Sequence, residues 1–295
     1  MSIREEQLVS WSKAPSDTED QRCLNAISQV VQAMTSRFGS DVEVYTQGSH
    51  KNRTNIRVDS DVDIVVQHKH AYLNDVSSLD GAAKAIYDTH FTPLDYTFQT
   101  FKNEVEATLR AAFPGDAVER KNKCIRIPGN TYRVNADVVP AFTHHRMQGG
   151  PYRAEAEGIK LIADDGVHVV SYPVQHHNNG RQKHTDTALH FKKAVRILKH
   201  IRRELVDAGI IHKDLASSHF IECLVWNQPH STFQEDTFKD MLNNIVLDIS
   251  MDMDDTTKAN DYAEVSDLLW LFRGSAKRTP ADAKVFADAA FSYIT

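Results

Sequence analysis

Two aspartates at the start of a strand-like run have the spacing of a metal site. Asp61 and Asp63 lead into the apolar run Ile64-Val65-Val66. Because strand side chains alternate between the two faces, both carboxylates are expected on one face, a few ångströms apart. Carboxylates that close repel each other unless a cation lies between them. Oxygen ligands suit Mg²⁺ or Mn²⁺ better than zinc, so the pair predicts a magnesium site completed by a substrate phosphate.

A third aspartate supports this interpretation over two simpler ones. Two aspartates at this spacing also occur in solvated turns and in structural calcium sites. Asp137, however, is the only acid in the apolar, strand-like run 132–140. A charge in so apolar a strand needs a partner. A metal ion shared with Asp61 and Asp63 would supply it.

A glycine-serine pair precedes the aspartates. Gly48 and Ser49 follow the strand-like run 42–45. A glycine lets the backbone approach a phosphate closely, and the serine hydroxyl and nearby amides can bind its oxygens. Glycine-serine, two aspartates on one strand and one on a later strand is the signature of the polymerase-β-type nucleotidyltransferases.

Composition and charge narrow the function classes. The chain has 295 residues, of which 41% are hydrophobic and 25% charged, which is typical of soluble globular proteins. No apolar stretch approaches the ~20 residues of a membrane span, and the first residues lack the apolar core of a signal peptide. A cytoplasmic protein without membrane contact is therefore expected. The three cysteines are scattered and indicate neither a disulfide framework nor a zinc site.

The net charge of −6 argues against a protein that grips long nucleic acid, because that usually requires a basic face. Free nucleotides remain possible ligands, since they need only a local basic patch and a metal. The histidine pairs 144–145 and 176–177 lack regular ligand spacing, and we interpret them as surface polar residues.

Hydrophobic periodicity predicts an α+β protein in two parts. The first half should hold helices at 18–38 and 95–113 and a mixed sheet, with β-like runs at 117–127, 132–142, 159–162 and 167–170. The second half should be all-helical, with helices at 185–208, 217–227, 232–250, 261–273 and 280–294, the last capped by Thr279. We place the division at 172/173.

A run of basic residues marks the expected helix 185–208 and the segment before it. Such a run is often only a solvated helix face. In an otherwise acidic chain it could instead hold a triphosphate, and Lys199 lies on one stripe with Lys192 and Arg196. The basic residues are Arg181, Lys183, Lys192, Lys193, Arg196, Lys199, Arg202 and Arg203.

With these motifs, the proline-led segment 172–180 and the segment 215–227, the chain resembles the CD-NTase family over nearly its full length. This family comprises the bacterial relatives of cyclic GMP-AMP synthase and oligoadenylate synthetase, and the details are most similar to the CdnE-like clade. The resemblance implies a polymerase-β-type nucleotidyltransferase core at 1–172, an all-helical domain at 173–295 and an active site in the cleft between them.

The resemblance also implies roles for the first motif. Gly48 and Ser49 would hold the donor triphosphate. Asp61, Asp63 and Asp137 would bind two Mg²⁺ or Mn²⁺ ions and catalyse in-line attack of a ribose hydroxyl on the α-phosphate. Asp137 is expected to take the hydroxyl proton.

Further nucleotide contacts are implied in the second half. Lys199 and Ser218 match residues that reach the triphosphate, and His219 stands where relatives have an aromatic residue that stacks on the base. Asn178 or Asn179 is a candidate for a base contact; the alternative is that both are turn residues beside the following glycine.

The implied function is template-independent synthesis of a cyclic dinucleotide or short cyclic oligonucleotide from ATP, UTP or other NTPs. In the bacterial anti-phage signalling of this family, the product reaches a separate effector protein. Two alternatives remain: a terminal transferase that extends RNA or modifies a small acceptor, and a catalytically dead nucleotide-binding module. The three carboxylates disfavour the second.

Overall fold

The structure is a computed structural model that describes residues 3–14, 16–56, 61–91, 95–148, 150, 154–274 and 278–295. The chain divides into two compact units. The first, which we call the sheet unit, contains Asp17–Gln47 and Ser60–Pro173. The second, the helical unit, contains Met1–Ser16, Gly48–Asp59 and Val174–Thr295. The helical unit is thus built from three separate pieces of the chain, whereas the sequence predicted one continuous piece. The division at 172/173 stays a prediction.

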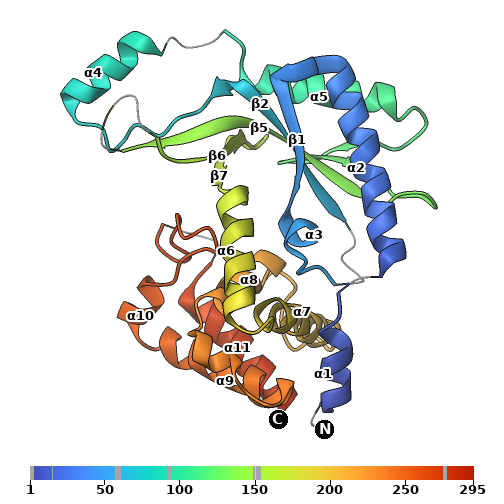
Figure 1. Cartoon of the computed structure of the whole chain (residues 1–295), viewed down its shortest axis with the longest axis vertical. Coiled ribbons are helices and arrows are strands. Elements are labelled where there is room, and N and C mark those ends of the chain that lie inside the picture. The colour runs from blue at the N-terminus through green and yellow to red at the C-terminus, as the bar shows by residue number, and fades with distance from the viewer. Residues whose placement is uncertain are drawn as a thin grey trace. The chain divides into compact units, whose positions relative to one another are not determined.

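The sheet unit is organised around one mixed sheet (Figure 1). Its strand order is β1-β2-β5-β4-β3, with β6 paired to the far part of β5 and β7 paired to β6. Strands β2 and β5 run parallel, and the other pairs are antiparallel. The strands are β1 (Val42–Gln47), β2 (Val62–Tyr72), β3 (Glu119–Arg120), β4 (Ile125–Ile127), β5 (Ala136–Met147), β6 (Ala154–Ile162) and β7 (His168–Ser171).

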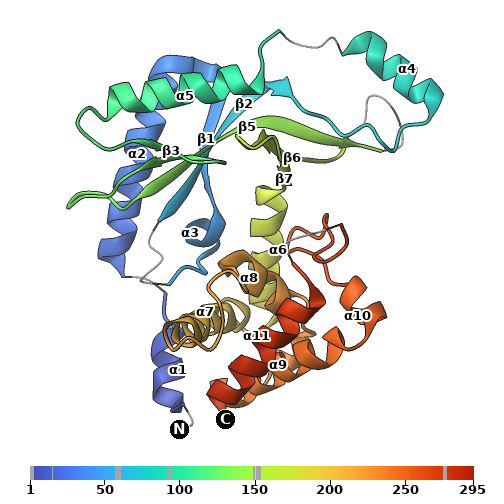
Figure 2. The same ribbon diagram turned by 180° about the vertical axis from the view of Figure 1, so that it is seen from behind.

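Helices α2 (Asp17–Phe38) and α5 (Phe98–Ala112) pack against this sheet and against each other, as the second view also shows (Figure 2). Thr97 caps α5 by accepting a hydrogen bond from the backbone of Thr100. Phe101 and Leu109 lie fully buried on the inner face of α5, at the helical spacing that predicted this helix. Two shorter elements complete the unit: the 3₁₀ turn η1 (Gly39–Asp41) and α4 (Gly81–His90).

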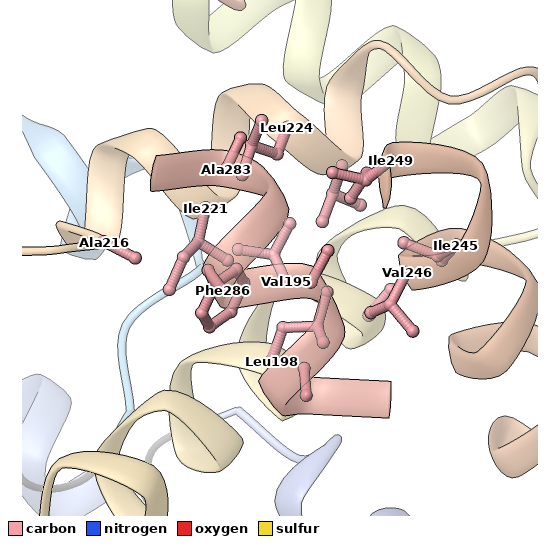
Figure 3. Packing of buried hydrophobic residues seen from close by; sticks show 14 of the residues in the cluster. Val195, Leu198, Ala216, Ile221, Leu224, Ile245, Val246, Ile249, Ala283 and Phe286 are labelled. Carbon is pink, nitrogen blue, oxygen red and sulfur yellow. The ribbon is translucent and has the colours of Figure 1, made fainter. Parts of the chain in front are cut away.

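The helical unit packs around α7. Figure 3 shows its core, in which Val195 and Leu198 from α7 meet Ile221 from α8, Ile249 from α9 and Phe286 from α11. Residues 178 onward contain no named strand in the part that the structure describes. The helices of the unit are α1 (Glu5–Trp11), α3 (Gly48–Asn52), α6 (Pro173–Asp186), α7 (Phe191–Asp207), α8 (Ser218–Trp226), η2 (His230–Phe233), α9 (Phe238–Met253), α10 (Thr256–Asn260) and α11 (Pro280–Ile294).

The N-terminal helix α1 is fixed to the C-terminal helices. Leu8 is fully buried in their core, and the ring of Trp11 stacks on His200 at 5.1 Å. The Glu5 carboxylate accepts hydrogen bonds from the backbone amides of Phe238 and Lys239 at the start of α9. Orphan amides at a helix start are satisfied well by a carboxylate.

The mixed sheet and the helical second half are confirmed, as are the β-like runs 159–162 and 167–170, which pair as β6 and β7, and the cap of α11. Thr279 and Asp282 form a complete capping box. The predicted helix 185–208 is wrong in its first turn, because Ala188 and Leu189 have φ of 48° and 66° and separate α6 from α7. Its apolar Leu189 is 53% exposed.

Two further helix predictions need correction. The segment 261–273 is an irregular loop with an isolated bridge between Ala263 and Trp270. Val265 and Leu271 are buried in the core of the helical unit without a helix, so the helical spacing of the segment is fortuitous. The predicted helix 232–250 is the turn η2 followed by α9, which is capped by Thr237. No helix among the described residues is both long and apolar enough to cross a lipid bilayer.

One ion cluster ties α5 to the outer strands of the sheet. The Lys102 side chain, 1% exposed, donates to the Asn122 carbonyl at 2.7 Å and to Asp164 at 2.8 Å. Arg120 binds the same carboxylate with two nitrogens, at 2.7 and 2.9 Å. These hydrogen bonds, first from Arg120 and then from Lys102, lower the pKa of Asp164 to about 2.

We expect Asp164→Asn to lower the free energy of unfolding by about 2 kcal/mol at pH 7, because buried Lys102 loses its carboxylate partner. A depressed pKa stabilises the fold fully above the unfolded pKa of about 4, and this contribution is lost as the pH falls through the folded value. Urea unfolding at pH 7, 4 and 2.5 should therefore show a difference from wild type that shrinks with acid. Asp88→Asn, which removes only an exposed pair with Lys84, should change stability by less than about 0.5 kcal/mol; an equal effect of both variants would contradict the assignment.

Candidate active site

The parallel pairing of β2 with β5 brings two of the predicted carboxylates together. Asp63 and Asp137 are each the second residue of their strand and are direct partners in the register. In-register residues of neighbouring parallel strands project from the same face. Asp61 comes two residues before Asp63, just ahead of β2. The carboxyl groups therefore gather at the N-terminal ends of the two central strands.

Asp61 is held by two side chains that the sequence analysis did not select. Its Oδ2 accepts a hydrogen bond from Arg126 at 2.8 Å, and its Oδ1 accepts one from Asn135 at 2.7 Å. Arg126 lies on β4 directly opposite Asp137, and its second terminal nitrogen is 3.9 Å from the Asp137 Oδ1. Arg126 is thus a counter-ion shared by two of the three aspartates. In the sequence, Arg126 is marked only by being a basic residue between Ile125 and Ile127, just before Pro128.

The environment of Asp137 favours its neutral form. Burial raises the pKa of Asp137, the charge of Arg126 opposes this, and the charge of Asp61 adds to the rise. Its Oδ1 atom is buried and accepts no hydrogen bond from the residues that the structure describes. Nearby Cys124 is affected in the same direction: burial and the charges of Asp137 and Asp63 raise the pKa of its thiol to about 12. The Asp137 Oδ1 therefore lacks a hydrogen-bond donor, although the Arg126 guanidinium lies 3.9 Å away.

The donor set fits a hard cation, although the ligands are not gathered around one point. Asp63 and Asp137 offer carboxylate oxygens side by side, and these suit Mg²⁺ or Mn²⁺. Asp61 is turned to Arg126. Among the described residues, no three histidine, cysteine, aspartate or glutamate side chains are close enough to hold a metal ion. For all three aspartates to bind a cation, Asp61 must exchange its contact with Arg126 for the metal.

The glycine-serine pair begins a short helix rather than a loop. Gly48 follows directly on Gln47, whose partner across the β1–β2 ladder is Asp63. Its φ of 69° lies in the left-handed region that favours glycine. This turn leads the chain from β1 into α3, where the Ser49 carbonyl accepts a hydrogen bond from the Thr54 amide at 3.0 Å.

Lys199 and its neighbours point into the helical unit. Lys199 is 3% exposed, and its Nζ donates to the Thr54 carbonyl at 2.9 Å. Arg196 donates to the backbone carbonyls of Ser12 and Arg53, and Lys192 is buried as well. This stripe, predicted as a triphosphate-binding surface, mainly binds the protein's own backbone. The role of Lys199 at the triphosphate stays a prediction.

The remaining candidates lie on α6 and α8. Ser218 is the first residue of α8, and Ser217 caps that helix. Desolvation lowers the pKa of His219 to about 4, so its ring is neutral at pH 7. His176 stands 5.5 Å from that ring and is bonded to Glu222 at 3.1 Å. The interpretation of His176 as a surface residue is therefore wrong.

Asn178 and Asn179 are helical residues of α6, so their interpretation as turn residues is wrong. Asn178 is exposed, whereas Asn179 donates to the Val265 carbonyl at 2.9 Å. Gly180 lies buried on the face of α6 that packs against Phe191 and Val265. Tertiary packing there outweighs the low helix propensity of glycine.

Because Arg126 is shared, we expect two substitutions to shift the pKa of Asp137 in opposite directions. In the metal-free protein, Arg126→Gln should raise the pKa of Asp137 further, because a nearby positive charge is lost. Asp61→Asn should lower it, because a negative charge is lost and Arg126 is freed to bind Asp137. Titration of ¹³C-labelled aspartate carboxyls by NMR measures both shifts. Arg110→Gln, which alters an exposed residue of α5, serves as the control and should leave Asp137 unchanged; shifts of equal sign in the two test variants would contradict the geometry.

Comparisons with known proteins identify the family of the chain. Residues 178–295 match the cGAS/DncV-like nucleotidyltransferase C-terminal helical domain. The whole chain is 41% identical to a cyclic dipurine nucleotide synthase of Elizabethkingia meningoseptica, of which 99% is covered. It is 33% identical to a cyclic dipyrimidine nucleotide synthase CdnE of Cecembia lonarensis, with 98% of each chain covered.

A solved structure of the Elizabethkingia meningoseptica CdnE cyclic dinucleotide synthase with GTP and Apcpp superposes with a TM-score of 0.84 at 39% identity, covering 99% of both chains. The Rhodothermus marinus CdnE c-UMP-AMP synthase, solved with Apcpp and Upnpp, gives a TM-score of 0.83 at 29% identity over 98% of this chain and 95% of that one. The likeness extends through both the sheet unit and the helical unit. The chain therefore belongs to the CD-NTase family, within its CdnE clade.

Proposed function

We propose that this protein joins two NTPs into a cyclic dinucleotide and releases one pyrophosphate at each of the two bonds. The observation that carries the proposal is the in-register pair of Asp63 and Asp137 on parallel strands, with Asp61 beside it. The named activities of the similar proteins, all cyclic nucleotide synthases, support the same reaction. The alternative is a terminal transferase that uses an RNA end or a small acceptor.

Asp61, Asp63 and Asp137 would hold the Mg²⁺ or Mn²⁺ ions of the reaction. When bound, two such ions neutralise the leaving pyrophosphate and lower the pKa of the acceptor hydroxyl. Asp137 would receive the hydroxyl proton, a role supported by its Oδ1, which accepts no hydrogen bond from the described residues. Arg126 then compensates the negative charge that remains around Asp61.

The nucleotide itself would be bound by residues of the helical unit. Gly48 and Ser49 are the first residues of α3. Their backbone amides and the serine hydroxyl would bind oxygens of the donor triphosphate. Ser218 adds a hydroxyl at the start of α8. His219 offers a neutral ring with 38% of its side chain exposed, which can stack on a base, although over a smaller area than a larger aromatic ring would.

Base choice follows from few side chains and differs among the similar proteins. The synthase with 41% identity is named for purine products and the one with 33% identity for pyrimidine products. ATP, GTP, UTP and CTP are all candidate substrates. Exposed Asn178 could read a base edge, because an amide both donates and accepts. We further propose that the product acts in bacterial anti-phage signalling by binding a separate effector protein.

The proposal predicts a phosphatase-resistant product. The purified protein is incubated with Mg²⁺ or Mn²⁺ and each α-labelled NTP in the presence of the other three, treated with phosphatase, and analysed by chromatography and mass spectrometry. A cyclic dinucleotide should form, and its labels name the bases. Asp63→Asn and Asp137→Asn should each reduce its formation at least about 100-fold, because the ligand set is incomplete. Asp88→Asn, on exposed α4, is the matched control and should retain activity.

Other products would decide against the proposal. Linear chains that phosphatase degrades, or products that grow only on added RNA or a small acceptor, would assign the terminal-transferase activity instead. A product that persists in the Asp63→Asn and Asp137→Asn proteins would show that these carboxylates do not catalyse the reaction.

A further inference from the structure

The segment that carries Gly48 and Ser49 is anchored through one buried threonine. Thr54 is fully buried and uses three polar groups. Its amide donates to the Ser49 carbonyl at 3.0 Å, which closes α3. Its carbonyl accepts from Lys199 at 2.9 Å, and its hydroxyl donates to Glu222 at 3.0 Å and accepts from Lys199 at 3.4 Å. Because the Thr54 amide is bonded to the Ser49 carbonyl, the position of Thr54 affects the orientation of α3.

Glu222 is the centre of the group that holds Thr54. It lies on α8, one turn after Ser218, and is 4% exposed. One carboxylate oxygen accepts from Thr54 and the other accepts from His176 Nε2 at 3.1 Å; Lys199 stands 4.0 Å away. Burial alone would raise the pKa of Glu222, but the hydrogen bond from His176 and the charges of His176 and Lys199 lower it to about 2. The carboxylate is ionised at neutral pH.

The same short segment is held at two further points. Arg196 on α7 donates to the Arg53 carbonyl, and His177 on α6 is 3.4 Å from the Asn52 side-chain oxygen. Helices α6, α7 and α8 thus each bind the stretch that follows Ser49. All these contacts lie within the helical unit.

A buried network of this kind is poorly explained by stability alone. Removing charges from water is costly, and replacement of a buried ion pair by apolar residues is often neutral or stabilising. The charged groups instead fix the position of the segment after Ser49, because their hydrogen bonds to it form at one position only. They thereby fix the orientation of the backbone that directly follows Gly48 and Ser49.

We propose that Glu222 is a positioning residue for nucleotidyl transfer, which acts through the Thr54 hydroxyl to hold α3 in the orientation that binds the donor triphosphate. The inference rests on the proposed function of Gly48 and Ser49. It assigns to Glu222 an effect on nucleotide binding without contact with the nucleotide.

The test is a double-mutant cycle with Thr54→Val and Glu222→Gln. Valine keeps the shape of threonine and removes the hydroxyl, and glutamine leaves one acceptor where Glu222 uses two. Binding of the α,β-methylene analogues of ATP and GTP with Mg²⁺ is measured by calorimetry, and kcat and KM are measured with the natural NTPs. Thermal unfolding establishes a temperature at which every variant is folded.

Each single variant should weaken binding of the preferred analogue about 10-fold, the size expected for one lost hydrogen bond to a charged group, and should raise KM more than it lowers kcat. The double variant should be no weaker than the poorer single one, because both changes break the same link. Thr54→Ser, which restores the hydroxyl, should bind almost as wild type.

Thr232→Val is the matched control. Thr232 is also buried in the helical unit, and its hydroxyl donates to a carboxylate, Asp248, at 3.2 Å, but it does not bind the segment after Ser49. Thr232→Val should affect stability and leave analogue binding unchanged. An equal loss of binding in Thr232→Val would show a general effect of destabilisation and would overturn the proposal.

Other outcomes are equally decisive. Wild-type affinity in Thr54→Val, or additive losses in the double variant, would mean that Glu222 does not act through Thr54. If Glu222→Gln fails to fold, Thr54→Val and Thr54→Ser still decide whether the hydroxyl matters. A wild-type protein that binds neither analogue and forms no product would refute the proposed function itself, whereas normal binding and turnover with an unaffected Thr54→Val would refute only the positioning role.

Discussion

The parallel pairing of β2 with β5 is the constraint on which the rest of the site depends. It places Asp63 level with Asp137, and the strand residues that follow each of them, 64–66 and 138–142, are buried. A parallel pair requires a long connection, and here that connection includes α4, α5, β3 and β4. Strand β4 then returns beside β5 and delivers Arg126 opposite Asp137. The pairing of β5 with β2 thus aligns two carboxylates, and its pairing with β4 adds the guanidinium of Arg126.

The structure treats its charges in two different ways. At the strand ends, Asp61 and Asp137 share Arg126, and the burial of Asp137 leaves an oxygen that no described donor satisfies. In the helical unit, by contrast, three buried charged side chains are engaged: Lys199, Arg196 and Glu222 bind backbone or each other. An incompletely satisfied cluster is suited to accept an ion or substrate, whereas a satisfied one maintains geometry. This distinction separates the groups suited to chemistry from those that support them.

The sequence predicted what depends on local periodicity and failed where distant contacts decide. The alternation around Asp63 and Asp137 predicted the two strands, and the period of α5 predicted its buried face. The segment 261–273 has helical spacing but no helix, because its buried residues, such as Val265 and Leu271, reach the core of the helical unit from an irregular backbone. The partners of Lys199 could not be predicted either, since Thr54 lies 145 residues earlier in the chain. Glu222 could have been noticed in the sequence, because it is the only acid in the apolar helix α8.

The three-piece construction of the helical unit has a consequence for biosynthesis. Residues 1–16 and 48–59 leave the ribosome long before α7, α9 and α11, against which they pack or which complete their core. A domain folds as a unit only when its parts are all present. The sheet unit is complete in sequence once Pro173 has been translated, but α1 packs against α7 and α9, and the segment after Ser49 is bound by α6, α7 and α8. A ribosome-bound nascent chain would thus hold its strands early and gain an anchored α3 late, so that chains truncated before α8 would lack these anchors of the Gly48–Ser49 segment.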